Sequence, residues 1–224
     1  MILCIETSST VCSVALFEEG ELVAFSESNE AKNHSTVLVP MVDNVLSKAR
    51  ISFSQLTAVA ISAGPGSYTG LRIGTSTAKG FCMALDIPLI SISTLPAIAQ
   101  GYVRENNIKE GLICPMFDAR RMEVYYWLGD FNGKELHPVQ PLVLDELSFA
   151  SLLEQQKIIF IGEGSKKACS LLSHKNASFA SDFNPSARWL GVIAEKKLLL
   201  GEVEDVAYYE PFYLKETMIN IKKA

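Results

Sequence analysis

Apolar and polar positions alternate in short runs over the first 28 residues. The segment 2–6 is short and largely apolar, which is typical of a buried strand. A polar turn at 7–10 leads into the alternating segment 11–18, and a second turn at 19–20 leads into 21–28. The pattern predicts three consecutive strands joined by hairpins.

Helical and strand-like segments then alternate up to about residue 106. The predicted elements are helix 35–48, strand 58–62, helix 71–85, strand 88–92 and helix 94–105. Ser35 and Thr94 stand where two of these helices begin, and a hydroxyl oxygen can accept a hydrogen bond from the free N–H groups there. We therefore expect both residues to act as caps.

The same succession starts again in the second half of the chain. Its predicted elements are strands 112–118 and 123–128, a strand within 140–144, helix 148–155, strand 157–162, helix 165–172 and helix 185–201. In the last helix Asn184 can cap, Pro185 can occupy the first helical position, and Gly201 can end the helix. Pro211 argues against a central strand in the tail.

A doubled strand–strand–strand–helix–strand–helix unit is typical of the fold of actin, hexokinase and Hsp70. We therefore predict an α/β protein of two domains, each with a mixed sheet and flanking helices, the second reduced in size. The expected domains are 1–106 and 107–224, with helix 185–201 packing back on the first. In this fold the hairpin turns of both domains face a cleft that holds phosphate.

Charge and cysteine content narrow the function classes. The formal net charge is −5, and Lys and Arg form no block longer than a pair, whereas a protein that holds nucleic acid by itself usually carries a basic face. The five cysteines include no C-x-x-C pair, which favours free thiols in a reducing compartment. No signal-type segment opens the chain and no apolar stretch reaches membrane-span length, so we expect a cytoplasmic protein without a membrane partner.

Two loops carry groups that could hold an anion. Their candidate residues are Glu6, Thr7 and Ser8 at the first hairpin, and Gly64, Gly66 and Ser67 before helix 71–85. Turn hydroxyls and the free amides of a helix start both suit phosphate, although an ordinary polar turn and a tight structural turn are the simpler interpretations. The glycines form no P-loop, because no Lys-Ser/Thr follows at the required spacing, and no dinucleotide loop, because Pro65 stiffens the turn.

The second hairpin concentrates charge at Asp118, Arg120, Arg121 and Glu123. A solvated turn with a local ion pair and a cleft-facing contact with an anion or a partner both fit this cluster. The histidines are isolated in the sequence, and no spacing indicates a metal pair or a catalytic triad. The role of the hairpin stays open at this point.

The two longer helices of the first half carry more apolar or small residues than an ordinary surface helix. Apolar residues of helix 35–48 cover more of its circumference than an amphipathic stripe requires. Helix 71–85 is rich in small residues, and glycine inside a helix costs about 1 kcal/mol relative to alanine, which indicates close approach by another backbone. The apolar surplus is either core on two sides or an interface with a partner.

Nearly the whole chain resembles the TsaB family, also called YeaZ. The matching segments are I-E-T-S-S at 5–9, H-S-x-x-L-x-P at 34–40, A-G-P-G-S-Y-T-G-L-R-I-G at 63–74, D-I-P-L-I-S-I-S-T-L at 86–95, D-A-R-R-M-E-V-Y at 118–125 and E-P-F-Y-L at 210–214. Glu6 departs from the Asp of many relatives but keeps the charge. The related catalytic subunit TsaD carries an H-x-x-x-H metal pair where 93–100 of this chain has no histidine, and 162–164 is at most a remnant of its adenosine segment.

The resemblance implies a non-catalytic scaffold subunit. It implies pairing with a TsaD-like catalytic subunit and a TsaE-like ATPase, with a homodimer in the absence of TsaD. Such a complex transfers threonylcarbamoyl to N6 of the adenosine beside the anticodon of ANN-decoding tRNAs, so tRNA is an indirect partner. This chain alone would hold no metal and no cofactor tightly, and ATP or ADP would bind at the level of the complex.

The resemblance also assigns roles to residues. The implied docking residues are Val37, Leu38, Met41, Val42, Val45, Gly74, Thr75, Ala78 and Phe81. The cleft residues Glu6, Thr7, Ser8, Gly64, Gly66, Ser67, Asp118 and Arg120 would then be vestigial. Two alternatives stay open, an active ATP-dependent transferase or kinase of the same fold and a peptidase, which lacks a nucleophile–base pair at a recognisable spacing.

Overall fold

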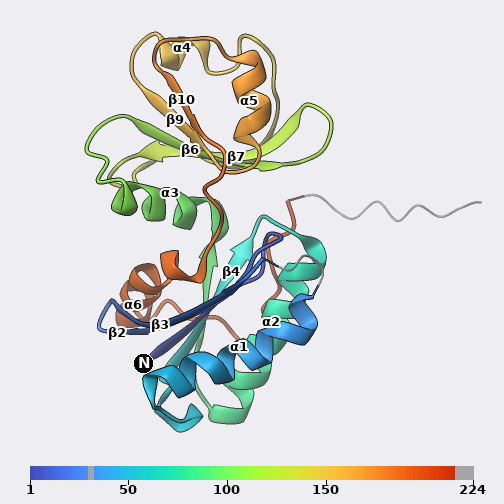
Figure 1. Ribbon diagram of the computed structural model, residues 1–224, viewed down its shortest axis with the longest axis vertical. Helices are drawn as coiled ribbons and strands as arrows, with labels where there is room; N and C mark the ends of the chain where they lie inside the picture. The colour runs from blue at the N-terminus through green and yellow to red at the C-terminus, as the bar shows by residue number, and fades with distance from the viewer. Residues whose placement is uncertain (30–32, 215–224) are drawn as a thin grey trace, which may run out of the picture.

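The first half of the chain builds one mixed five-stranded sheet (Figure 1). The computed structural model describes residues 1–29 and 33–214. The elements of this half are β1 (Ile2–Glu6), β2 (Cys12–Glu18), β3 (Glu21–Ser28), α1 (His34–Ala49), η1 (Phe53–Gln55), β4 (Ala58–Gly64), α2 (Tyr68–Leu85), β5 (Leu89–Ser93) and α3 (Thr94–Glu105). The strand order is β3-β2-β1-β4-β5, with antiparallel pairs up to β1 and parallel pairs beyond it.

The second half repeats this plan. Its elements are β6 (Leu112–Asp118), β7 (Glu123–Asp130), β8 (Glu135–Val143), α4 (Ala150–Leu153), β9 (Ile158–Ile161), α5 (Ser165–Leu171), β10 (Ala177–Ala180), η2 (Ala187–Trp189) and α6 (Gly191–Leu199). The strand order β8-β7-β6-β9-β10 reproduces that of the first sheet, and β6 again pairs antiparallel on one side and parallel on the other. Two mixed sheets with flanking helices confirm the predicted actin-like α/β fold.

All five residues of β1 are buried, because packed elements cover both faces of the first sheet. Leu3 and Ile5 belong to the core cluster formed with α1 and α2. Ile2 and Cys4 belong to the cluster on the opposite face, formed with α3, η2 and α6. Burial on both faces explains why this strand is a continuous apolar run rather than an alternating one.

Helix α3 forms a layer between the two sheets (Figure 1). Ala97 joins the core cluster of the first sheet, whereas Leu95 packs with Trp127 and other residues of the second. Helix α6 returns to the first sheet, where Ala194 is buried against it. The boundary at residues 106/107 stays a proposal, since α3 shares its core with both sheets.

Two predicted caps of the first half differ from the structure. Helix α1 follows Asn33, so Ser35 lies inside the helix. The start of the helix is held instead by buried His34, whose Nε2 lies 3.0 Å from the Ser9 carbonyl oxygen. Thr94 is the first residue of α3 and accepts a hydrogen bond from the Gly64 N–H, at 3.1 Å, so it connects α3 to the β4 end.

The second half departs from the sequence prediction at the start of its last helix, at β8 and at β10. Strand β8 begins at Glu135, ahead of the predicted 140–144. Asn184-Pro185 does not start an α-helix; Ser186 caps the short helix η2, and α6 begins after it. Gly201, at φ +70°, follows α6 as the predicted stop. Strand β10 was not predicted, because its four residues lie at the edge of the sheet and are only partly buried, which leaves little hydrophobic signal.

Candidate functional site

A cavity of about 520 Å³ lies between the two halves of the chain, at the first hairpin turn. Its lining comes from the first hairpin, the start of α1 and α2, and the second sheet. The lining residues are Ser8, Ser9, Thr10, His34, Gly66, Ser67, Thr69, Gly70, Ile73, Phe117, Asp118, Tyr125 and Glu163. This cavity, called the cleft below, lies where the fold predicts a phosphate-holding site.

Glu6 is not among the residues that line the cleft, and groups inside the protein hold its carboxylate. Glu6 is 1% exposed, and its Oε1 accepts hydrogen bonds from the Ser8 N–H at 2.6 Å and the Ser62 hydroxyl at 2.8 Å. Burial raises the pKa of Glu6, and the hydrogen bonds from Ser8, Ser62 and Thr7 oppose this rise without cancelling it. The first hairpin therefore uses its carboxylate to fix its own backbone.

The glycines at the start of α2 leave room for the first hairpin to pack closely against them. A Cβ on Gly70 would lie 2.0 Å from the Thr7 carbonyl oxygen, and one on Gly74 would lie 2.3 Å from Thr7 Oγ1. A Cβ on Gly66 would lie 2.5 Å from the Ser8 carbonyl oxygen. The close backbone approach expected from these small residues is therefore made within the chain. Gly80 is different, since no described atom outside its chain neighbours and the adjoining helix backbone lies within 4 Å of the Cβ position.

Two amides of the glycine loop are already bonded inside the protein. The Ser67 N–H donates to the Ser8 carbonyl oxygen at 2.6 Å, and the Gly70 N–H donates to Ser67 Oγ at 3.2 Å. Gly64 has φ +108°, a conformation that only glycine adopts at little cost. The loop binds the hairpin with groups that an anion would otherwise take.

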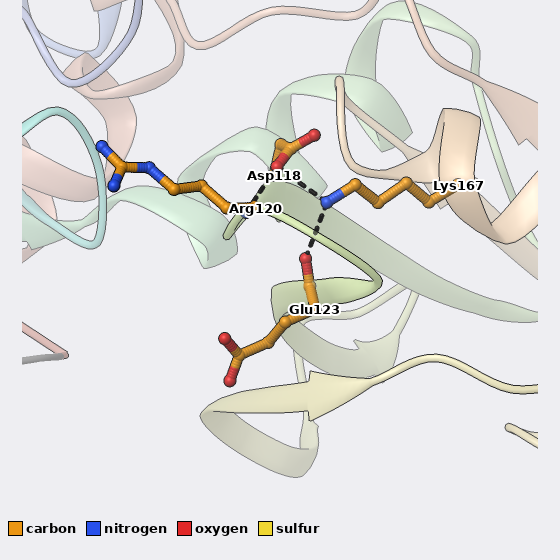
Figure 2. Close-up of polar contacts among 4 residues, drawn as sticks. All are labelled: Asp118, Arg120, Glu123 and Lys167. Atoms are coloured by element: carbon orange, nitrogen blue, oxygen red, sulfur yellow. Dashed lines mark hydrogen bonds and ion pairs between the residues drawn. The ribbon is translucent and has the colours of Figure 1, made fainter.

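The second hairpin carries an ion pair that sequence reasoning missed. Figure 2 shows Lys167 of α5 pointing at Asp118, with Nζ 2.8 Å from Oδ1 and 3.0 Å from the Glu123 carbonyl oxygen. The Arg120 N–H also donates to Asp118 Oδ1, at 2.6 Å. Partial burial raises the pKa of Asp118, but these hydrogen bonds outweigh it and the net pKa is lowered. Lys167 stands 49 positions further along the chain, so only the fold brings it here.

The arginines of this hairpin face a second cavity, of about 990 Å³. Arg120 and Arg121 have φ +72° and +48°. The lining residues are Pro65, Gly66, Tyr68, Asp118, Ala119, Arg120, Arg121, Met122, Glu123, Tyr125, Val143, Phe212, Tyr213 and Leu214. We call it the arginine–tyrosine cavity. The Arg120 side chain extends away from the Asp118–Lys167 pair in Figure 2.

Most of the implied docking residues are core in this chain. Those that are buried are Leu38, Met41, Val42, Val45, Gly74, Thr75 and Ala78. Val37 and Phe81 are partly buried and pack against the same cluster. The seven buried residues have little surface to offer a partner, whereas Val37 and Phe81 keep part of theirs and stay candidates for a docking surface. Val39, 45% exposed, is the large apolar side chain that α1 presents outward, and α2 presents Tyr68, 36% exposed, and Met83, 73% exposed.

Within residues 1–29 and 33–214, no three His, Cys, Asp or Glu side chains are placed to share a metal ion. The helices of the described chain include none with the length and apolar content of a membrane span. The five cysteines are free, and four of them are buried.

Sequence comparison relates nearly the whole chain to proteins of tRNA modification. A family model described as TsaD, tRNA N6-adenosine threonylcarbamoyltransferase, matches residues 27–223. The tRNA threonylcarbamoyladenosine biosynthesis protein TsaB of Bacillus subtilis is 30% identical over 224 residues, covering 96% of this chain and 93% of that protein. The chain belongs to the TsaB family. The resemblance of the six sequence segments is thereby confirmed.

Solved structures extend the relation to three dimensions. YeaZ from Pseudomonas aeruginosa is 27% identical, with a TM-score of 0.82 over 95% of this TsaB-family chain and 99% of its own. The activator of 2-hydroxyisocaproyl-CoA dehydratase from Clostridium difficile, whose structure holds ADPNP, has a TM-score of 0.52 at 12% identity, covering 91% of this chain and 98% of that one. The second likeness concerns the fold alone.

Proposed function

We propose that this TsaB-family chain is a non-catalytic subunit in the biosynthesis of tRNA threonylcarbamoyladenosine. It pairs with a TsaD-like transferase, which a TsaE-like ATPase joins, and it forms a homodimer when the transferase is absent. The complex transfers threonylcarbamoyl to N6 of the adenosine beside the anticodon of ANN-decoding tRNAs. This pathway is supported by the names of the TsaB relatives and of the matching family model. Free thiols fit a reducing compartment, and we include the cytoplasm in the proposal.

The burial of Glu6 is the observation that carries the non-catalytic role. A general base or a metal-binding carboxylate must reach the reacting group. Glu6 is 1% exposed and binds Ser8 and Ser62 instead. Asp118, at the opposite side of the cleft, is held by Lys167. Glu6 and Asp118 therefore support the architecture of the cleft, and Glu163 is the remaining carboxylate of its lining.

The outer face of α2 supports a docking role. The exposed residues of this helix are Tyr68, Thr69, Arg72, Ser76, Gly80, Met83 and Ala84. Gly80 weakens the helix by about 1 kcal/mol relative to alanine, yet nothing in the described chain approaches its Cβ position. A partner backbone packed at this point would account for the glycine. We therefore propose this face, with Val39 of α1, as the surface that meets the transferase or a second copy.

Substitutions at Gly80 test the docking surface. Gly80→Lys keeps a good helix former but places a long charged side chain on the proposed contact. Association with the co-expressed transferase, measured by calorimetry, should fall more than tenfold, because a buried unpaired charge costs several kcal/mol. Ser170→Lys, on exposed α5, is the matched control and should associate like the native chain. Equal affinity for both variants would refute the docking surface.

A reconstituted modification assay tests the role itself. Transfer of threonylcarbamoyl to tRNA should require this chain, and Glu6→Gln should retain it, because the variant keeps an acceptor oxygen for Ser8 and Ser62. An active kinase or transferase makes the opposite prediction. The isolated chain would then bind ATP–Mg²⁺ tightly and turn it over, and Glu6→Gln would abolish the activity.

A further inference from the structure

The tip of the second hairpin holds two consecutive arginines in a conformation that arginine avoids. Their φ angles are +72° at Arg120 and +48° at Arg121. The Cβ of an L-residue crowds the following carbonyl there, whereas glycine adopts the conformation freely. Both residues line the arginine–tyrosine cavity. Of the positive-φ residues other than glycine in the described chain, Arg120 and Arg121 are the two that follow one another directly, so the strain draws attention to what these guanidinium groups bind.

Aromatic side chains form the opposite wall of the same cavity. Tyr68, at the start of α2, and Tyr213, near the end of the described chain, have ring centroids 4.8 Å apart. Arg72 stacks on Tyr68, 4.0 Å from the ring centroid, and its Nε donates to the Tyr213 hydroxyl at 3.3 Å. Phe212 is 48% exposed beside them. The cavity thus joins guanidinium groups to flat apolar faces.

We propose that the arginine–tyrosine cavity binds an unpaired strand of the RNA substrate, an inference that rests on the proposed function and replaces the indirect contact expected from the sequence. Arg120 and Arg121 pair with phosphates, since a guanidinium matches the geometry of phosphate oxygens. Phe212 and the exposed part of Tyr68 offer aromatic surface to bases, which stack on such rings in single-stranded RNA, while Arg72 and Tyr213 hold Tyr68 in place.

The charges around the cavity are compatible with a phosphate strand. Asp118 is neutralised by Lys167, with Nζ 2.8 Å from its carboxylate. Glu123 is the other acid of the lining, and Arg120 and Arg121 outweigh its single charge. An acidic protein segment could also pair with the arginines. Each nucleotide of RNA carries both a phosphate for the arginines and a base for the aromatic wall, and for this reason RNA is the occupant that we propose.

The double variant R120G/R121G tests the inference without damaging the fold. Glycine suits positive φ, so thermal unfolding of the variant should occur at the same or a higher temperature than that of the native chain. Arg50→Gly is the matched control, because Arg50 also has positive φ (+57°) and is exposed, but caps the far end of α1. Binding of unmodified tRNA to the complex with the transferase is measured by fluorescence anisotropy at several KCl concentrations.

The expected result is a loss of affinity of about tenfold for R120G/R121G and none for Arg50→Gly. The slope of log K against log salt should shrink by about 1.4, since each phosphate contact on single-stranded nucleic acid contributes about 0.7. Unchanged affinity and slope would overturn the RNA site. Loss of the TsaE-like ATPase from the complex with RNA binding intact would assign the cavity to a protein instead.

Failure of the proposed function gives a different result. If the native chain does not associate with the transferase, the partner assignment fails, but the RNA inference is still tested with the chain alone. The same variants are then titrated with tRNA at low salt. A native chain that shows no arginine-dependent binding in either experiment would refute the inference.

Discussion

Replacement of Glu6 gives a sharp prediction, because alanine and glutamine should act in opposite directions. Glu6→Ala removes the acceptor of two buried donors, the Ser8 N–H and the Ser62 hydroxyl. Each buried donor left unsatisfied costs about 1–3 kcal/mol, so the expected loss of unfolding free energy is about 2–6 kcal/mol. Only a loss at the upper end of this range would exceed the lower bound of about 5 kcal/mol for the stability of an ordinary domain.

Glutamine at the same position keeps Oε1 as an acceptor and removes the buried charge. Because burial raises the pKa of Glu6 in the folded protein, the stability that this group contributes is complete below its unfolded pKa and is lost as the pH rises through its folded pKa. Each unit of upward shift corresponds to about 1.4 kcal/mol at neutral pH. Glu6→Gln should therefore equal or exceed the native stability at pH 7, and its advantage should shrink towards pH 4.

Urea denaturation of the three proteins between pH 4 and pH 8 measures both effects. The slopes of unfolding free energy against urea concentration should agree, which would show that the variants share one folded state. A destabilisation of Glu6→Gln by more than about 2 kcal/mol that does not vary with pH would refute the reasoning. That outcome would mean that Glu6 is ionised and that its surroundings require the charge.

Further predictions concern the α2 glycines and the second hairpin. Gly70→Ala should lower the unfolding free energy by about 1–3 kcal/mol in urea denaturation, because its Cβ would meet the Thr7 carbonyl oxygen at 2.0 Å. Gly80→Ala should raise it by about 1 kcal/mol, because the methyl group meets no described atom, while weakening association with the transferase in calorimetry. Lys167→Met should lower it by at most about 1 kcal/mol at neutral pH, because Asp118 is 44% exposed and solvent screens the pair. The lowered pKa of Asp118 contributes stability above the unfolded pKa, so this last difference should disappear as the pH falls through the folded pKa.

The doubled order of strands and helices follows from local pattern. The apolar run of β1, the hairpins and the alternating helices depend on neighbours a few residues apart, and these residues are visible in the chain itself. The glycines of α2 also predicted a close contact, because glycine inside a helix lowers its stability. Edge strand β10 escaped prediction, since its partly buried residues carry little of the pattern that marks a strand.

The sequence by itself determined the fold and the family of this protein, because both are carried by local periodicity and contiguous motifs. Only the packing of the folded chain shows which side chains are exposed to a ligand or a partner. The sequence shows that Val42 and Val45 are apolar, but only the packing of α1 on the sheet shows that they are buried. Glu6 meets Ser62 across 56 positions, and Asp118 meets Lys167 across 49. Such partners are set by the packing of distant segments, which no local pattern encodes.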